Sequence, residues 1–129
     1  HTRRGFETFV LAREVRDIEA RNAGAAAPDP VDGMLSRARV RGTVRESARL
    51  AAAVRTHLAE VRQNDNGTRQ APFDVLENLK MPATLIEIGF IDNAQEGVEL
   101  VQPATLRHIA DAIADGIEGW NAHPDPGPR

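Results

Sequence analysis

The most informative segment of the sequence reads Met81-Pro82-Ala83-Thr84-Leu85-Ile86-Glu87-Ile88-Gly89-Phe90-Ile91-Asp92-Asn93. Residues 83–91 are apolar, β-branched or small, with the single exception of the carboxylate Glu87. Pro82 precedes the run and Asp92 follows it, which is the pattern of a strand that is buried on both faces of an α/β sheet. The segment therefore predicts an α/β fold with one acidic side chain inside the sheet.

Glu87 is the candidate catalytic residue. Burying an uncompensated carboxylate is costly, so a Glu in a buried strand indicates a use for the charge. Ligands of α/β sheets bind just beyond the carboxyl ends of strands, where we expect Glu87 to lie. We also expect Gly89 to leave the same face of the strand open. The alternative is a Glu on a half-exposed edge strand that pairs with an arginine.

Length and composition limit the classes of protein. A chain of 129 residues forms one domain at most. It has no cysteine, which excludes disulfides and thiol catalysis. It has no apolar run long enough for a transmembrane segment. The chain opens with His1 rather than Met and shows no signal-peptide pattern, so we interpret its start as a processed or cut end.

Charge is uneven along the chain. The net charge is −3, but residues 1–69 carry 13 basic and 9 acidic side chains, and residues 70–129 carry 3 basic and 10 acidic ones. The densest basic cluster has no aromatic residue among its arginines, which argues against nucleic-acid binding. We interpret this cluster as a solvated loop and helix start; it consists of Arg37, Arg39, Arg41 and Arg45.

The pattern of the sequence predicts alternating strands and helices. Before the Glu87 strand we expect a strand at residues 5–11, a helix at 12–22, a proline-rich loop at 25–36 and a long helix from Thr43. Thr43 and Glu46 fit a capping box at that start. Residues 64–67 break the helix, and residues 70–76 are a second strand candidate.

After the Glu87 strand, Asn93 is placed to cap a short helix, and Pro103 opens a last helix that ends near Trp120. The order predicts a three-layer α/β sheet with helices on both faces. Three strands form a thin sheet for helices this apolar, so we expect a fold that is seen here without its first strands.

Several blocks of this sequence resemble consecutive blocks of the zinc-dependent N-acetylmuramoyl-L-alanine amidases. The similarity runs in order from Gly5 to Trp120, and its most specific block is Met-Pro-x-x-Leu-x-Glu-x-Gly-Phe-x-x-Asn at residues 81–93. The other blocks lie at residues 5–9, 19–23, 47–51, 70–76 and 109–117, together with Glu96 and Leu100.

The resemblance implies an amidase/phosphorylase-like fold and a peptidoglycan hydrolase. Such enzymes cleave the amide between N-acetylmuramic acid and the L-alanine of the stem peptide. They bind one zinc through two histidines and a glutamate, and the metal activates a water. A further glutamate, in the block that matches Glu87, takes the proton of the water and passes it to the leaving amine. The resemblance also implies action outside the cytoplasm, in the periplasm, the cell wall or a secreted form, with an activator or a cell-wall-binding domain as possible partners.

The sequence departs from the family at the zinc ligands. In the family these lie in a Gly-His-Gly type loop, a following helix and a Ser-x-His-x-Asn block, all upstream of the Gly-x-Glu-Thr block, and none of these motifs occurs here. His1 is close to the right region, but Thr2-Arg3-Arg4 does not match His-x-Asn, so we interpret His1 as loop. Residues 1–120 therefore resemble the carboxyl-terminal portion of one catalytic domain without a complete metal site, and residues 121–129 form a proline-rich tail or linker.

Other residues carry weaker hypotheses. Gln70, Phe73 and Asn78 flank the strand expected near Glu87 and are candidates for a substrate groove, with loop packing as the alternative. We expect Glu7 to pair with an arginine. Residues 25–42 fall where some members of the family carry an inserted regulatory helix, and here we expect a short, mobile surface loop.

Two further functional hypotheses stay open at this point. One is another metal-dependent amidohydrolase or carboxypeptidase on a related scaffold, against which the Gly-Phe-x-x-Asn continuation argues. The other is an inactive fragment or degenerate domain that binds cell wall or a partner protein, which the missing ligand motifs favour.

Overall fold

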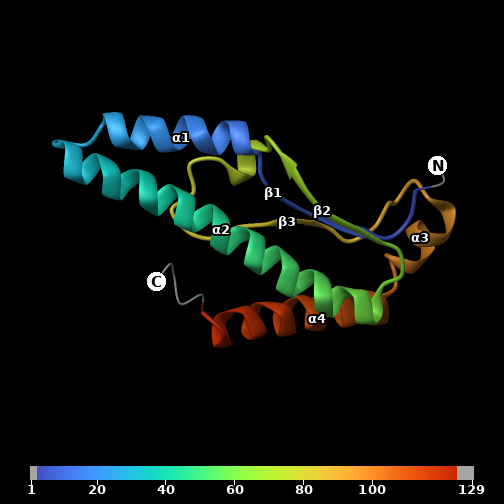
Figure 1. The fold of residues 1–129 in the computed structure, drawn as a ribbon. Helices are drawn as coiled ribbons and strands as arrows, with labels where there is room; N and C mark the ends of the chain where they lie inside the picture. Colours follow the sequence, from blue (N-terminus) through green and yellow to red (C-terminus); the bar gives the residue numbers. More distant parts are fainter. Residues whose placement is uncertain (1–2, 125–129) are drawn as a thin grey trace.

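The computed structural model describes residues 3–124 and has a small mixed sheet flanked by helices (Figure 1). The central strand β1 pairs in parallel with β2 and antiparallel with β3, in the order β2-β1-β3. This arrangement confirms the predicted α/β class. The elements are β1 (Phe6–Leu11), α1 (Arg13–Ala25), α2 (Pro30–Val61), β2 (Asp65–Ala71), the 3-10 helix η1 (Asp74–Leu76), β3 (Leu85–Glu87), α3 (Ala94–Glu99) and α4 (Pro103–Ala122).

The main core lies between the sheet and the helices α2 and α4. Phe6 of β1 is fully buried there against Val54 and Leu58 of α2 and Ile109 of α4. Burial of one such side chain contributes roughly 1.5–3 kcal/mol. The helices α2 and α4 lie side by side over this face (Figure 1).

A second apolar cluster involves the other face of β1. Side chains alternate along a strand, so Phe9 points away from Phe6. The ring of Phe9 meets that of Phe73 edge to face, with centroids 5.1 Å apart, and Leu76 of η1 and Leu85 of β3 complete the cluster. The segment after β2 is thereby held against the sheet.

The long helix begins 13 residues earlier than Thr43, and the predicted loops at residues 25–36 and 25–42 were wrong. Asp29 caps α2, because its Oδ1 accepts from the N–H groups of Val31 at 2.8 Å and Asp32 at 3.0 Å. Pro30 supplies the first helical residue, where its missing N–H is tolerated. Thr43 lies inside the helix and donates its hydroxyl to the carbonyl of Arg39.

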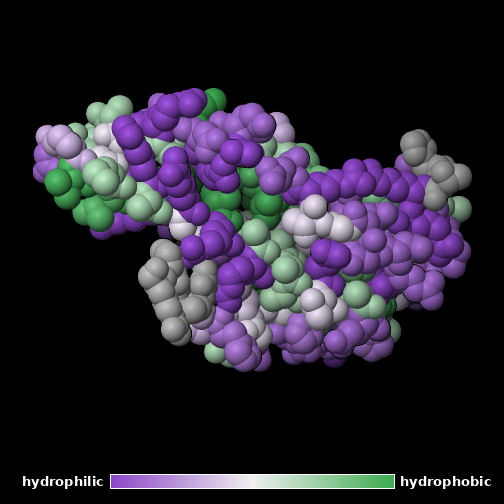
Figure 2. Space-filling view, in the orientation of Figure 1, coloured by the Kyte–Doolittle hydropathy of each residue, from purple (hydrophilic) through white to green (hydrophobic). Residues whose placement is uncertain are grey.

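The helices α1 and α2 form an antiparallel hairpin that extends beyond the sheet (Figure 1). The arginines predicted to lie in a loop and helix start are therefore all on α2. Hydrophobic residues gather at the far end of the hairpin (green at the left in Figure 2), where Val31, Met34 and Leu35 are exposed.

Two strand predictions need correction. The second strand covers residues 65–71 rather than 70–76, and Pro72, which has no N–H to donate, follows its last residue. Residues 83–91 contain only the three-residue strand β3, which lies at the edge of the sheet among the described residues and is half-buried. The predicted burial of this segment on both faces was therefore wrong.

The remaining element predictions hold with small shifts. Helix α1 runs three residues past Asn22, Asn93 caps α3, and Pro103 opens α4. Helix α4 reaches Ala122, and residues 125–129 of the predicted tail lie outside the described residues. Between residues 3 and 124, no helix combines the length and the apolar character needed to span a bilayer.

Candidate active site

Glu87 is the last residue of β3 and lies directly across from Glu7 of β1. Residues that face each other across an antiparallel pair project their side chains on the same side of the sheet. Glu7 is fully buried and Glu87 is half-buried. The two carboxylates therefore form a pair on the face of the sheet opposite to Phe6.

Two arginines compensate the buried charge of Glu7. Arg3 Nη2 lies 2.5 Å from Glu7 Oε1, and Arg69 Nε lies 2.9 Å from Glu7 Oε2. The Arg69 contact is an ion pair without hydrogen-bond geometry, and Oε2 accepts no hydrogen bond from a side chain or backbone N–H among the described residues. Arg3 also lies over the ring of Phe90, 4.7 Å from its centroid. The expected pairing of Glu7 with an arginine is confirmed.

The surroundings of Glu87 favour its protonated form. Burial raises the pKa of the Glu87 carboxyl above its ordinary value, and a hydrogen bond to Glu7 and the charge of Glu7 raise it further. The positive charges of Arg3 and Arg69 act in the opposite direction. A carboxyl with a raised pKa can both accept and return a proton nearer to neutral pH, as general acid–base catalysis requires.

A second buried carboxylate, Glu96 of α3, fixes the backbone around this pair. Its Oε1 accepts from the N–H of Gly5 at 2.8 Å and from Arg62 Nη2 at 2.7 Å, and its Oε2 accepts from the N–H of Phe90 at 2.9 Å. Gly5 precedes β1 and Phe90 follows β3. Glu96 therefore ties together the two strands that carry the carboxylate pair.

The space beside Gly89 is filled rather than open. A Cβ at this position would lie 2.7 Å from Leu100 Cδ1 and 3.1 Å from Arg62 Nη2. The prediction that Gly89 leaves a strand face free was wrong. A side chain at this position would displace Leu100 and press on the buried Arg62–Glu96 pair.

The three predicted groove residues each contact residues other than Glu87. Gln70 Oε1 accepts from the N–H of Arg13 at 3.2 Å in the first turn of α1, and Phe73 packs on Phe9. Asn78 donates its backbone N–H to Glu19 Oε1 at 2.6 Å. In the sheet, Gln70 lies across from Val10, three residues along β1 from Glu7. These contacts agree with loop packing, and a role in a substrate groove stays a prediction.

The described residues do not fit a complete zinc site. Within residues 3–124, no group of three or more His, Cys, Asp or Glu side chains is arranged to hold a metal. His1 lies outside the described residues. The zinc ligands that the family resemblance implies are therefore not supplied by the described part of the chain.

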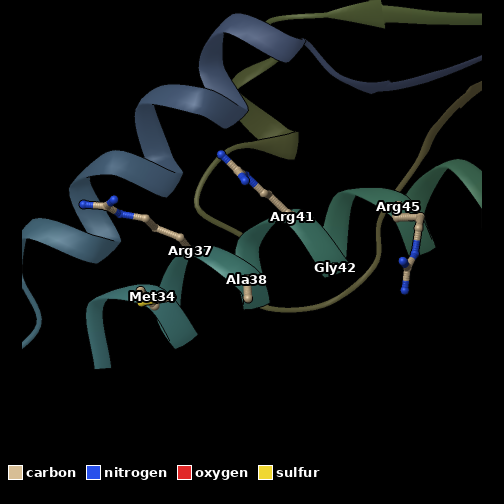
Figure 3. Close-up of a pocket in the computed structure, with 6 residues that line it drawn as sticks. All are labelled: Met34, Arg37, Ala38, Arg41, Gly42 and Arg45. Atoms are coloured by element: carbon tan, nitrogen blue, oxygen red, sulfur yellow. The ribbon is translucent and has the colours of Figure 1, made fainter. Parts of the chain in front are cut away.

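An open groove of about 670 Å³ lies along α2, away from the carboxylate pair (Figure 3). Its arginines Arg37 and Arg41 point toward α1, whereas Arg45 points away from it. The groove has no acidic residue in its lining, which is completed by Met34, Ala38 and Gly42. It provides positive charge but no proton acceptor.

The fold and the sequence of the chain match one family of amidases. The profile of the N-acetylmuramoyl-L-alanine amidase family matches residues 1–119. The chain therefore belongs to this family.

Individual relatives agree with this assignment. The N-acetylmuramoyl-L-alanine amidase LytC of Bacillus subtilis is 38% identical over 75 residues, which are 57% of this chain and 15% of LytC. The fold is similar to that of the N-acetylmuramoyl-L-alanine amidase of Clostridium difficile 630, with a TM-score of 0.69, 21% identity and coverage of 97% of this chain and 52% of that one. It is also similar to the amidase AmiC2 of Nostoc punctiforme, with a TM-score of 0.61, 22% identity and coverage of 93% and 49%. The chain thus spans about half the length of these solved structures.

Proposed function

We propose that this chain is part of a peptidoglycan amidase that hydrolyses the amide between N-acetylmuramic acid and the L-alanine of the stem peptide. Family membership over residues 1–119 supports the reaction class. The observation that carries the role of a specific residue is the position of Glu87, at the end of β3 and beside Glu7, where burial raises its pKa.

Glu87 would act first as a general base and then as a general acid. Its carboxylate accepts a proton from the water whose oxygen attacks the amide carbonyl carbon. The bond from that carbon to the alanine nitrogen then breaks, and Glu87 returns the proton to the leaving amine. The carboxyl ends the cycle in the state in which it began, so no other proton donor is required.

Zinc is a separate part of the proposal. In this family the metal would polarise the carbonyl and activate the water. Because residues 3–124 do not provide its ligands, we assign Glu87 only the proton transfers. Action outside the cytoplasm, and an activator or a cell-wall-binding domain as partner, are proposed on the same family grounds.

Replacing Glu87 by glutamine in the full-length natural protein tests this role. Glutamine keeps the shape of the side chain but cannot exchange a proton, so we expect amidase activity to fall by about 100- to 10,000-fold. The measurement is the release of new L-alanine amino termini from purified peptidoglycan.

The matched control is Glu60→Gln, which removes an exposed carboxylate from α2 and should leave the activity unchanged. If Glu87→Gln hydrolyses peptidoglycan at the parent rate, Glu87 does not carry the proton.

A further inference from the structure

Glu7 is a buried charged residue to which the proposed reaction gives no role. It lies at the centre of the sheet, it is fully buried, and its cross-strand partner is another glutamate. Like charges directly opposite each other destabilise a sheet. An apolar residue at this position would avoid both the burial of charge and the repulsion, so the presence of Glu7 needs a reason.

The contacts of Glu7 leave room for one more hydrogen bond. Arg3 occupies Oε1, while Arg69 pairs electrostatically with Oε2 without donating a hydrogen bond to it. Glu87 lies directly across from Glu7 in the strand register, so its carboxyl is the group placed to share a hydrogen bond with Glu7. Two carboxylates can share such a bond only when one of them carries a proton. Because both arginines contact Glu7, Glu87 is the donor in such a bond, and the bond forms when Glu87 holds a proton, as it does after taking one from the water.

We propose that Glu7 is a positioning residue for Glu87, whose carboxyl it orients through a carboxyl–carboxylate hydrogen bond while Arg3 and Arg69 hold Glu7 in place. The inference rests on the proposed function where it concerns catalysis. Its structural part, the coupling of two carboxylates across β1 and β3, stands on the strand register and the ion pairs.

The charged groups that act on Glu87 come from three segments of the described chain. Glu7 of β1 raises its pKa, and Arg3 of the amino-terminal segment and Arg69 of β2 lower it. Removing Glu7 and removing Arg69 should therefore shift the pKa of Glu87 in opposite directions. If Glu7 served only to fill space in the sheet, these two replacements would not be expected to shift the pKa of Glu87 in opposite directions.

The test is a direct titration of Glu87 in the full-length natural protein. Carboxyl-labelled glutamate gives a carbon NMR signal for each Glu, and Glu87→Gln assigns the relevant one. We expect the pKa of Glu87 to fall in Glu7→Gln and to rise in Arg69→Gln. The exposed controls Glu60→Gln and Arg41→Gln should leave it unchanged. An unchanged pKa in a folded Glu7→Gln protein would overturn the proposal.

Arg69→Gln keeps the test decisive if Glu7→Gln does not fold. Arg69 is half exposed, so its replacement should be tolerated, and a fall or no change in the pKa of Glu87 would contradict the proposal. Glu7→Asp gives a third variant, because it retains the charge but shortens the reach, and we expect it to preserve part of the raised pKa.

The pH profile of kcat/KM separates this inference from the proposed function. The acidic limb reports the pKa of the base in the free enzyme, so it should move to lower pH in Glu7→Gln and to higher pH in Arg69→Gln. If Glu87→Gln remains active, the proposed function fails while the titration still decides the coupling. A different result is that Glu87→Gln is inactive, while Glu7→Gln changes neither the pKa of Glu87 nor the acidic limb of the kcat/KM profile. In that case only the inference about Glu7 fails.

Discussion

Glu87 combines a chemical role with an unfavourable electrostatic position. Burial and the neighbouring Glu7 raise the pKa of its carboxyl in the folded protein, whereas in the unfolded chain this carboxyl titrates near the ordinary value. The folded state therefore binds this proton more tightly than the unfolded state does. The resulting stabilisation is complete below the unfolded pKa and is lost as the pH rises through the folded pKa.

Glu87→Gln should therefore be more stable than the parent at neutral pH. Glutamine has no proton to lose, so the variant is free of the pH-dependent loss of stability that the raised pKa of Glu87 causes. The gain in melting temperature should be present at pH 7 and should disappear below about pH 4, where the carboxyl is protonated in both states. Thermal unfolding of the two proteins across this range measures it, with Glu60→Gln as control. A variant that is less stable than the parent at pH 7 would show that Glu87 contributes to folding through contacts rather than strain.

Sequence reasoning identified Glu87 and Glu7 separately but not as a pair. A single carboxylate in the apolar run at 83–91 is a local signal, and it was sufficient to select Glu87. Which residue of β1 faces it depends on the register between strands about 80 positions apart, and no local pattern contains that information. Glu96 was named only as part of the family resemblance, and its role in linking the two strands was missed for the same reason, since its partners Gly5, Arg62 and Phe90 come from three other segments.

Among the elements, the helices α2 and α4 approach each other closely at Gly116. A Cβ at Gly116 of α4 would lie 2.5 Å from Val54 Cα and 3.0 Å from Val54 N, which are backbone atoms that cannot rotate away. Gly119, one turn further along the same helix, has only His57 Nε2 within reach, at 3.7 Å. The two glycines of α4 therefore differ in whether a methyl group can be accommodated.

Gly116→Ala should destabilise the protein by about 1–3 kcal/mol, because the two helices must separate to admit the methyl group. Gly119→Ala in the same helix should be neutral or stabilise by up to about 1 kcal/mol through helix propensity. Denaturant unfolding of both variants measures the difference. Equal effects of the two substitutions would mean that the helices are not in backbone contact at Gly116.

The helices that begin with a capping residue or a proline in the expected position were predicted well. Asn93 and Pro103 mark the starts of α3 and α4 as expected. The start of α2 was misplaced because the prolines at 28 and 30 indicated a loop, whereas Asp29 and Pro30 form a helix cap and first turn. The strand at 83–91 was predicted too long because its apolar composition reflects partial burial against two clusters, not strand pairing along its whole length.

At the scale of the whole molecule, the chain carries the candidate base of an amidase without a complete set of metal ligands among residues 3–124. It nevertheless has the fold of the corresponding half of the C. difficile domain. Under the proposed function, the proton-transfer residue and the metal ligands would come from different stretches of the chain.

A polypeptide of residues 1–129 should bind no zinc in stoichiometric amount, and an active full-length protein should contain about one zinc per chain. Elemental analysis together with the intact mass measures both. The 14.1 kDa chain provides the reference mass. Stoichiometric zinc on residues 1–129 would show that the described side chains rearrange or that His1 takes part. A full-length protein with neither zinc nor hydrolysis would favour a binding role.

Glu96 has a mechanical consequence for the whole site. Its planar carboxylate holds the amide of Gly5 with one oxygen and the amide of Phe90 with the other, so it acts as a spacer of fixed length between the entry of β1 and the exit of β3. A slip of one residue between these strands would turn Glu87 to the opposite face, toward Ile109 and Leu58. The spacer blocks such sliding, and a helix remote in sequence from β1 thereby determines which two carboxylates meet.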